Sequence, residues 1–357
     1  MLRVIDANLD RLGEGLRVLE DVARFILDDA GICREFKALR HRLSGDTRAI
    51  EQQLIAARRA GVDVGAFARV PDGTKHEDLT GLVRANARRT QESLRVLEEF
   101  ARLPRSPLGS KSRKFEHYRF EVYELEQRLV SGLLRNDRLR QLSGVCLVLD
   151  MESLKGRDEV DVAVQAMSGG VKAVQLRDKR RSRSDVVETA RKLQWACAER
   201  HVLFMVNDYV DIVLAVGADG LHVGQEDLPV VEARRILPAD RIVGCSTATV
   251  TEAVRAQAAG ADYVAVGSMF PTSSKDRYRL AGPDKLRRIR RKVFKPLVAI
   301  GGINQDNLED VIAAGADGVA VIGAILSAED VESAARALVA KLEQISSAEC
   351  DNGKTNS

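Results

Sequence analysis

The chain has 357 residues, of which 45% are hydrophobic and 4% aromatic, and its 55 basic and 52 acidic side chains leave a formal net charge of +3. This length predicts two domains, and the balanced charge and scarce aromatic rings argue against a nucleic-acid-binding protein. No apolar stretch reaches the roughly 20 residues that span a bilayer, and no signal-peptide pattern opens the chain, so we expect a cytoplasmic protein without a membrane partner. The five cysteines are widely spaced, which predicts that they are reduced.

The first part of the chain contains helical patterns and an internal repeat. The segment 7–24 recurs as 85–102, with Ala-Asn, Arg, Glu and Leu-Arg-Val-Leu-Glu at matching places. In the first copy, Leu16, Leu19 and Ala23 have helical spacing and predict one apolar face. Each copy therefore predicts an amphipathic helix.

A second helical pattern follows each copy of the repeat, near residues 33–60 and 112–134. Two helix pairs predict an all-α domain over residues 1–135, in the form of a four-helix bundle. A stretch of loop character, 61–76, separates the two halves and is long enough to suggest a function or mobility.

The polar residues of the repeat allow two interpretations. Their alternating charges are typical of a solvated helix face, on which each ion pair contributes about 0.2–0.5 kcal/mol. The repeated pairs Asn8 and Asn86, and Arg11 and Arg89, are more specific than charge balance requires, and they also fit a pocket for an anionic ligand. The chain has no GxxxxGK[ST] loop, so a nucleotide bound in this domain is not held by a P-loop.

From residue 136 to 345 short apolar runs alternate with amphipathic stretches, which indicates repeated βα units. We expect eight strands, at 144–149, 171–176, 202–206, 219–223, 241–244, 262–267, 296–300 and 317–322. Eight units in this length predict the α/β class and a (β/α)8 TIM barrel, with an open doubly wound sheet as the alternative. The polar residues 346–357 predict a frayed tail.

Polar residues follow the apolar runs, where a parallel barrel gathers its ligands. Gln175 and Arg177 share one face of the second strand, and Lys179 lies just beyond it. Two cations and an amide suit a phosphorylated ligand, although a solvated basic loop has the same composition.

Asn207 and Asp208 end the third strand, and Asp227 follows the fourth. Two carboxylates near phosphate-binding cations fit Mg²⁺ better than zinc, because Mg²⁺ takes one or two carboxylates and substrate phosphate oxygens. The alternative for Asp227 is the N-cap of the next helix. We expect His222 to pack within its strand rather than act as a catalyst.

The remaining strand ends carry hydroxyl groups and glycines. Ser246 follows the fifth strand as a ligand donor or a helix cap, and the loop after the sixth contains Thr272, Ser274 and Lys275. Glycine pairs after the last two strands, including Gly302, let backbone N–H groups approach a phosphate.

Read in order, these strand ends resemble thiamine phosphate synthase. The matching motifs are Gln175-Leu176-Arg177-Asp178-Lys179, Val206-Asn207-Asp208, His222-Val223-Gly224-Gln225-Glu226-Asp227, Pro271-Thr272-Ser273-Ser274-Lys275 and Gly301-Gly302-Ile303. The resemblance implies a transferase that joins 4-amino-2-methyl-5-(diphosphooxymethyl)pyrimidine to 4-methyl-5-(2-phosphooxyethyl)thiazole, releasing pyrophosphate in thiamine biosynthesis.

The resemblance also implies roles for individual residues. The residues implied to bind the pyrimidine diphosphate are Gln175, Arg177, Lys179, Asn207, Ser246 and Lys275, and the catalytic cations among them are Arg177, Lys179 and Lys275. Asp208 and Asp227 would hold Mg²⁺. The residues implied to hold the thiazole phosphate are Thr272, Ser274, Gly302, Ile322 and Gly323. This chain departs from the family at Ser274, where Thr is usual, and at Gly323, where Ser is common.

Residues 1–135 resemble a helical domain fused ahead of some thiamine phosphate synthases and considered a hydroxymethylpyrimidine phosphate kinase. The repeated Ala-Asn-x-x-Arg and Leu-Arg-Val-Leu-Glu motifs carry this likeness, which implies ATP as a further small-molecule ligand. A non-catalytic module for oligomerisation or binding is the alternative for this domain, and a thiazole tautomerase-like enzyme or a phosphate-binding barrel without catalysis is the alternative for the barrel. The sequence does not determine whether the chain forms a homo-oligomer.

Overall fold

The computed structural model describes residues 1–58, 76–272 and 279–354, and of these the side chains up to residue 348. The chain divides into two compact units, Met1–Asn136 and Asp137–Ser357. The loop predicted at 61–76 lies almost wholly outside the described residues. In the described part of the chain, no helix combines the length and apolar character that crossing a membrane requires.

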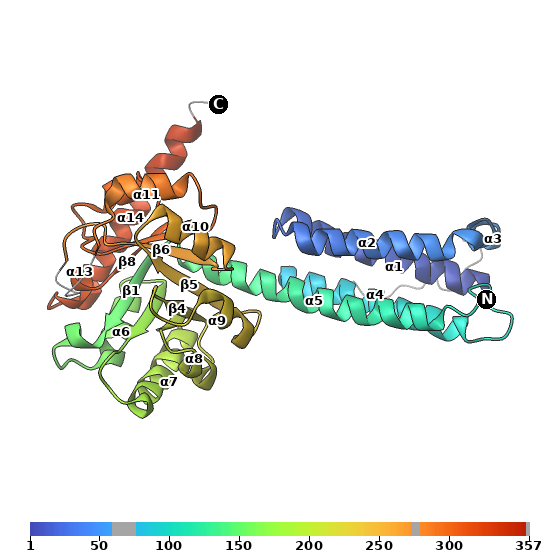
Figure 1. The fold of residues 1–357 in the computed structure, drawn as a ribbon, viewed down its shortest axis with the longest axis horizontal. Helices are drawn as coiled ribbons and strands as arrows, with labels where there is room; N and C mark the ends of the chain where they lie inside the picture. The colour runs from blue at the N-terminus through green and yellow to red at the C-terminus, as the bar shows by residue number, and fades with distance from the viewer. Residues whose placement is uncertain (59–75, 273–278, 355–357) are drawn as a thin grey trace. The chain divides into compact units, whose positions relative to one another are not determined.

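The first unit is helical, and its long helices run lengthwise beside one another (Figure 1). Its helices are α1 (Leu2–Phe25), α2 (Ala30–Thr47), α3 (Glu51–Ala57), α4 (Leu79–Ala101) and all but the last residues of α5 (Ser112–Gln141), which belong to the second unit. The helical pattern predicted at 33–60 is thus divided, because a 3₁₀ turn, Arg48–Ile50, separates α2 from α3. The two copies of the repeat form α1 and α4, which pack closely together: a Cβ on Gly15 would lie 2.4 Å from the Thr90 hydroxyl oxygen.

The second unit is a closed barrel of eight parallel strands in sequence order, which confirms the predicted TIM barrel and excludes the open sheet. The strands are β1 (Val145–Asp150), β2 (Ala173–Arg177), β3 (Leu203–Asn207), β4 (Gly220–Val223), β5 (Ile242–Thr247), β6 (Tyr263–Gly267), β7 (Leu297–Ile300) and β8 (Gly318–Val321).

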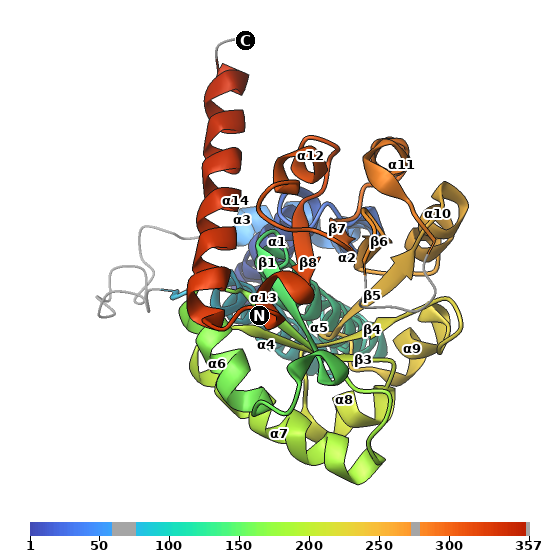
Figure 2. The ribbon, with the colours of Figure 1, turned by 90° about the vertical axis from the view of Figure 1, so that its left-hand side faces the viewer.

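Helices cover the outside of the barrel, as Figure 2 shows for α6 to α11 around the strands. They are α6 (Glu159–Ser168), α7 (Arg183–Glu199), α8 (Val210–Val216), α9 (Val230–Ile236), α10 (Val250–Ala258), α11 (Gly282–Arg290), α12 (Leu308–Ile312), α13 (Gly323–Leu326) and α14 (Val331–Lys354). The last helix continues to Lys354, past Ser346, where the sequence predicts a frayed tail.

The barrel has two apolar layers. The larger lies between the strands and the helices, and the smaller lies inside the barrel, where Leu142 packs with Cys146 and Ala320. Leu142 also lies at the start of β8, because a Cβ on Gly318 would meet its backbone oxygen. The side chain of Leu142 thus packs at the amino end of the strands.

Candidate active site

Most of the polar residues predicted for the strand ends line one cavity of about 650 Å³. We call it the polar cavity, and define it by the residues Gln175, Arg177, Lys179, Asn207, Asp208, Asp227 and Ser246. They lie on the last residues of β2, β3 and β5 or follow β2, β3 and β4, so the barrel topology brings them to one rim.

The carboxyl groups of Asp208 and Asp227 lie close together in the polar cavity, and each shifts the pKa of the other. Asp208 comes directly after β3 with a φ of 66°, a left-handed conformation that aspartate tolerates better than most residues, and its backbone N–H donates to the His222 oxygen at 2.8 Å. Asp227 accepts a hydrogen bond from the Gly224 N–H at 2.7 Å. Pro229, rather than Asp227, occupies the N-cap position of α9.

The two carboxyl groups have opposite pKa shifts. Burial, followed by the neighbouring Asp227, raises the pKa of Asp208. Burial also acts to raise the pKa of Asp227, but the hydrogen bonds from Asp208 and from the Gly224 N–H outweigh it and lower that pKa. The two carboxyl groups therefore titrate together, and Asp208 keeps its proton to a higher pH than an ordinary aspartate does.

Cations and amides surround this carboxylate pair. The Lys179 ammonium lies 3.3 Å from an Asp208 oxygen. The Gln175 amide donates to the Asn207 Oδ1 at 2.8 Å, across β2 and β3. The predicted amide and cation therefore reach the same cavity as the two carboxylates, from separate strands.

Arg177 is oriented by a residue to which the sequence analysis assigns no role. Its guanidinium donates to the Asp150 carboxylate, which is 3% exposed and also accepts from the Ser153 hydroxyl at 2.7 Å. Asp150 is a carboxylate at the end of an apolar strand, the same signal that points to Asp208. The strand prediction stops one residue short of it.

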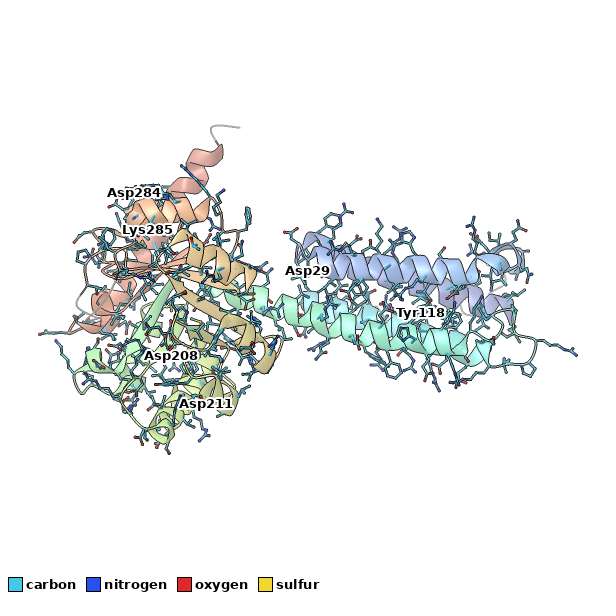
Figure 3. The ribbon with its side chains drawn as sticks, in the orientation of Figure 1. Asp29, Tyr118, Asp208, Asp211, Asp284 and Lys285 are labelled. Carbon is cyan, nitrogen blue, oxygen red and sulfur yellow. The ribbon has the colours of Figure 1, made fainter. Side chains whose placement is uncertain are left out.

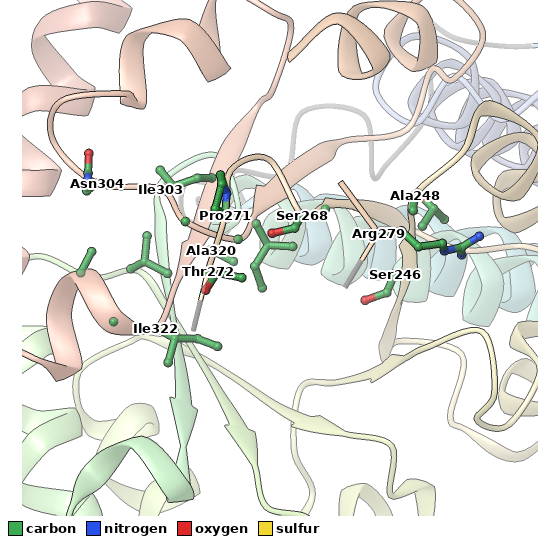
Figure 4. Close-up of a pocket in the computed structure, with 18 of the residues that line it drawn as sticks. Ser246, Ala248, Ser268, Pro271, Thr272, Arg279, Ile303, Asn304, Ala320 and Ile322 are labelled. Carbon is green, nitrogen blue, oxygen red and sulfur yellow. The ribbon is translucent and has the colours of Figure 1, made fainter. Parts of the chain in front are cut away.

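A second cavity of about 440 Å³ opens beside the ends of β5 to β8 (Figure 4). We call it the glycine cavity, and its predicted residues are Ser246, Thr272, Gly302, Ile322 and Gly323. Ser246 and Ile322 line both cavities. The predicted Ser274 and Lys275 lie outside the described residues.

Gly302 and Gly323 differ in the space around them. Gly302 has a φ of 69°, and a Cβ there would lie 2.5 Å from the Pro271 oxygen, so only glycine fits without rearrangement. A Cβ on Gly323 would meet only Ser327 Oγ, at 3.6 Å, which is an ordinary contact. The serine that is common at this position in the resembling family is therefore sterically allowed at Gly323.

Buried polar residues also contact Ser246 from inside the barrel. The His222 ring lies 2.8 Å from Ser246 Oγ through Nε2 and 2.8 Å from the Tyr263 hydroxyl through Nδ1. His222 is packed within the barrel, as expected, and it is also hydrogen-bonded to a predicted ligand-binding residue. Sequence alternation does not reveal this link, because it joins three strands.

Several polar residues of the repeat, the two asparagines among them, form contacts within the helical unit. The buried Asn8 and Asn86 side chains donate to backbone oxygens of Val4 and Leu82, each at 2.8 Å. On α4, Arg95 contacts Glu99 at 2.7 Å, as expected for a charged helix face. These contacts favour the interpretation of the repeat as helix stabilisation over a pocket built from the asparagines.

The chain is similar to characterised families along most of its length. Residues 145–325 match the family model described as thiamine monophosphate synthase, and residues 3–128 match that of the ThiD2 family. The protein named thiamine-phosphate synthase from Thermosynechococcus vestitus is 42% identical over 342 residues, with 96% of this chain and 95% of that protein covered. The protein of the same name from Gloeobacter violaceus is 39% identical, with 92% and 93% covered.

A solved structure resembles the second unit. The structure described as thiamine phosphate pyrophosphorylase from Pyrococcus furiosus aligns with a TM-score of 0.54 and 39% identity, covering 58% of this chain and 98% of that one. The alignment therefore takes in nearly all of the archaeal protein and leaves a large part of this chain unmatched.

Proposed function

The chain belongs to the thiamine monophosphate synthase family, and we propose from this premise how the rim of its barrel carries out the reaction. The enzyme is a thiamine-phosphate synthase, a transferase of thiamine biosynthesis with an N-terminal ThiD2 domain. The polar cavity takes the pyrimidine diphosphate and the glycine cavity takes the thiazole phosphate. This assignment of one substrate to each cavity rests on one observation: the two cavities adjoin at Ser246 and Ile322, so the two substrates would meet there.

The polar cavity has the charges that a diphosphate requires. Arg177, held by Asp150, and Lys179, beside Asp208, supply positive charge within it. Charge-assisted hydrogen bonds from preorganised cations are strongest where charge develops during a reaction. We assign Arg177 and Lys179 to the diphosphate, and Lys275 to the same role on the family resemblance alone.

Asp208 and Asp227 have the donor set that fits Mg²⁺. Their carboxyl groups are close enough to shift each other's pKa, and Mg²⁺ is typically bound by one or two carboxylates together with substrate phosphate oxygens. Within the described residues no group of three or more His, Cys, Asp or Glu side chains is arranged to hold a metal, so we assign the remaining ligands to substrate and water. Bound Mg²⁺ would neutralise negative charge on the diphosphate.

The reaction breaks the bond between the pyrimidine methylene carbon and the diphosphate oxygen, and it forms a bond from the thiazole nitrogen to that carbon. Pyrophosphate leaves with the electron pair of the broken bond. The attacking nitrogen carries no proton, so no general base is required. The task of the residues is to orient both substrates and to stabilise the departing anion.

Backbone geometry supports a phosphate site in the glycine cavity. Gly301 and Gly302 have φ angles of 100° and 69°, and the Ile322–Gly323 segment begins α13. Backbone N–H groups in such segments bind phosphates well. We assign the thiazole phosphate to Gly302, Ile322 and Gly323, with the Thr272 hydroxyl, and add Ser274 on the resemblance alone.

An assay of the purified chain with both substrates and Mg²⁺ tests the proposal. We expect thiamine phosphate and pyrophosphate in equal amounts, neither of which forms without the thiazole phosphate. A barrel of the tautomerase-like class would instead isomerise the thiazole compound, and a binding barrel would retain ligands without turnover. The charged polar cavity favours the synthase, because isomerising a monophosphate needs no site for a diphosphate.

For the helical unit we propose phosphorylation of hydroxymethylpyrimidine phosphate by ATP. The match of residues 3–128 to the ThiD2 family supports this activity. The test uses the full chain with the pyrimidine monophosphate and Mg-ATP, omitting the thiazole phosphate so that the diphosphate accumulates and can be followed by ³¹P NMR. If a preparation with full synthase activity forms no pyrimidine diphosphate in this assay, the helical unit is better explained as a non-catalytic module for oligomerisation or binding.

A further inference from the structure

A buried hydrogen-bonded chain connects Ser246 to the interior of the barrel. Ser246 lies on β5, His222 on β4 and Tyr263 on β6, and both contacts of the His222 ring measure 2.8 Å. His222 is 6% exposed and Tyr263 2% exposed. Hydrogen bonds away from water hold their geometry tightly, because the groups have no solvent partners to exchange with.

A glycine on the middle strand makes this chain possible. Gly244 pairs with Tyr263 in the sheet, and a Cβ at Gly244 would lie 2.0 Å from the Tyr263 Cζ. The Tyr263 ring therefore lies over Gly244 and stacks on His222 with a centroid distance of 5.6 Å. Any larger residue at Gly244 would displace the ring from His222.

The acceptors around Tyr263 favour one direction of the hydrogen bonds. Its single hydroxyl proton can go to His222 Nδ1 at 2.8 Å or to the Met205 sulfur at 3.4 Å. Donation to Nδ1 is favoured, because a thioether is a weak acceptor and an imidazole nitrogen a strong one. In the opposite arrangement, Nδ1–H donates to the Tyr263 oxygen and the hydroxyl proton goes to the sulfur. In the favoured arrangement the neutral ring carries its proton on Nε2 and donates it to Ser246 Oγ, which leaves the serine proton available for another acceptor.

We propose that Tyr263 and His222 are positioning residues that direct the Ser246 hydroxyl proton toward the diphosphate of the pyrimidine substrate. Ser246 lines both cavities, so it lies between the proposed diphosphate and thiazole sites. Figure 4 shows its side chain beside the glycine cavity. This inference rests on the proposed synthase function. It adds that two residues inside the barrel, which do not touch the diphosphate, orient the Ser246 hydroxyl so that it donates its proton to the diphosphate.

A double-mutant cycle tests the proposal through kcat/KM for the pyrimidine diphosphate. Ser246→Ala should lower it about 10- to 100-fold, the range for one hydrogen bond to a charged group. Tyr263→Phe, which keeps the ring, should lower it about 3- to 10-fold, because the histidine proton is no longer fixed. In the Ser246→Ala background, Tyr263→Phe should not lower kcat/KM any further. If the two substitutions instead lower kcat/KM independently, so that their factors multiply in the double variant, Tyr263 has a merely structural role and the proposal is overturned. Tyr118→Phe in the helical unit is the matched control and should leave kcat/KM unchanged.

The ¹⁵N NMR spectrum of the His222 ring provides a readout that does not depend on turnover. We expect Nδ1 to have the shift of an unprotonated nitrogen and Nε2 that of an N–H, and Tyr263→Phe to move both. The chain has five histidines, and the signals of His222 are the ones that disappear in His222→Gln. If His222→Gln does not fold, the signals that move in Tyr263→Phe identify His222 instead. A protonated Nδ1 in the wild-type chain would overturn the proposal, whereas absence of thiamine phosphate formation would overturn the synthase function and leave the spectrum to decide the tautomer.

Discussion

The Asp208 carboxyl group lies beside that of Asp227 at the ends of two neighbouring barrel strands, and each shifts the pKa of the other. Each carboxyl group is also tied to other parts of the site: Asp208 to the Lys179 ammonium, and Asp227 to the Gly224 backbone N–H. Two neighbouring carboxylates repel when both are ionised, and a divalent cation relieves that repulsion. The pair is therefore the part of the rim best suited to a metal-bound diphosphate.

Replacing Asp208 by Asn should lower the synthase rate by more than about 100-fold, the scale of losing one preorganised charge-stabilising group. Asparagine keeps the shape of the side chain and tolerates the φ of 66° at this position. Steady-state assays of pyrophosphate release measure the effect. Asp211→Asn is the matched control, because Asp211 is exposed on the neighbouring α8 (Figure 3) and should give wild-type kcat. A near wild-type rate in Asp208→Asn would refute the metal assignment.

Replacing Asp150 by Asn should weaken the use of the pyrimidine diphosphate through Arg177. The change removes the charged partner of a guanidinium that is 17% exposed, so its orientation is no longer fixed. We expect KM for the diphosphate to rise about 10-fold, within the range for a hydrogen bond between charged groups. KM for the thiazole phosphate should stay the same, and equal rises in both would indicate general damage to the barrel instead.

Replacing Gly302 by Ala should raise KM for the thiazole phosphate about 10-fold or more, because a Cβ 2.5 Å from the Pro271 oxygen forces the phosphate-binding backbone to move. Gly217 supplies a matched control. It has the same φ of 69°, and a Cβ there meets nothing within 4 Å. Gly217→Ala should cost about 1 kcal/mol of stability and leave both KM values unchanged. If the two variants show equal kinetics, Gly302 does not hold the phosphate.

Replacing Gly323 by Ser should improve binding of the thiazole phosphate. The site has room for the side chain, since a Cβ meets only Ser327 Oγ at 3.6 Å. A hydroxyl at this position adds a donor, and we expect KM for the thiazole phosphate to fall about 3- to 10-fold. The competing outcome is a higher KM, which would mean that a serine side chain blocks the backbone N–H groups.

Asp178 should make the barrel lose stability in acid. Burial acts to raise the pKa of this carboxyl, but hydrogen bonds from the Arg181 side chain and from the backbone N–H groups of Arg180 and Arg181 outweigh it and lower the pKa below its ordinary value of 3.8. A carboxyl with a lowered pKa in the folded state stabilises fully above about pH 5, and this contribution is lost as the pH falls through its folded pKa.

To test this, the free energy of unfolding in urea is measured for the wild-type chain and for Asp178→Asn at several pH values. Unfolding is followed by the fluorescence of the single tryptophan, Trp195, on α7. At pH 7 the wild-type barrel should be more stable by about 1–2 kcal/mol. The difference should shrink as the pH falls below about 4. A difference that stays constant with pH would show that the charge of Asp178 does not stabilise the barrel.

The sequence predicts the order of the barrel strands well, because each strand is an apolar run that ends in a polar residue. Its weakest prediction is the fifth strand, expected to end at residue 244 although β5 continues to Thr247. The last residues of β5 are polar, and pairing with β6 extends the strand: Ser246 and Thr247 pair with Ala265 and Val266.

The site is less predictable where it depends on contacts between strands. Arg177 and Asp208 are visible as strand-end residues, but their partners Asp150 and Lys179 become partners only through the barrel register. The Tyr263 ring lies in the interior because Gly244 leaves space for it, and that space depends on two neighbouring strands. Such relations follow from three-dimensional packing and leave no periodic signal in the sequence.

The purified full-length chain, supplied with the pyrimidine diphosphate, the thiazole phosphate and Mg²⁺, provides the most direct measurement. Mass spectrometry and a pyrophosphate assay then follow both products over time. The account predicts equal amounts of thiamine phosphate and pyrophosphate, and a loss of both by more than about 100-fold in Asp208→Asn. A folded wild-type chain that binds both substrates and forms neither product would contradict it.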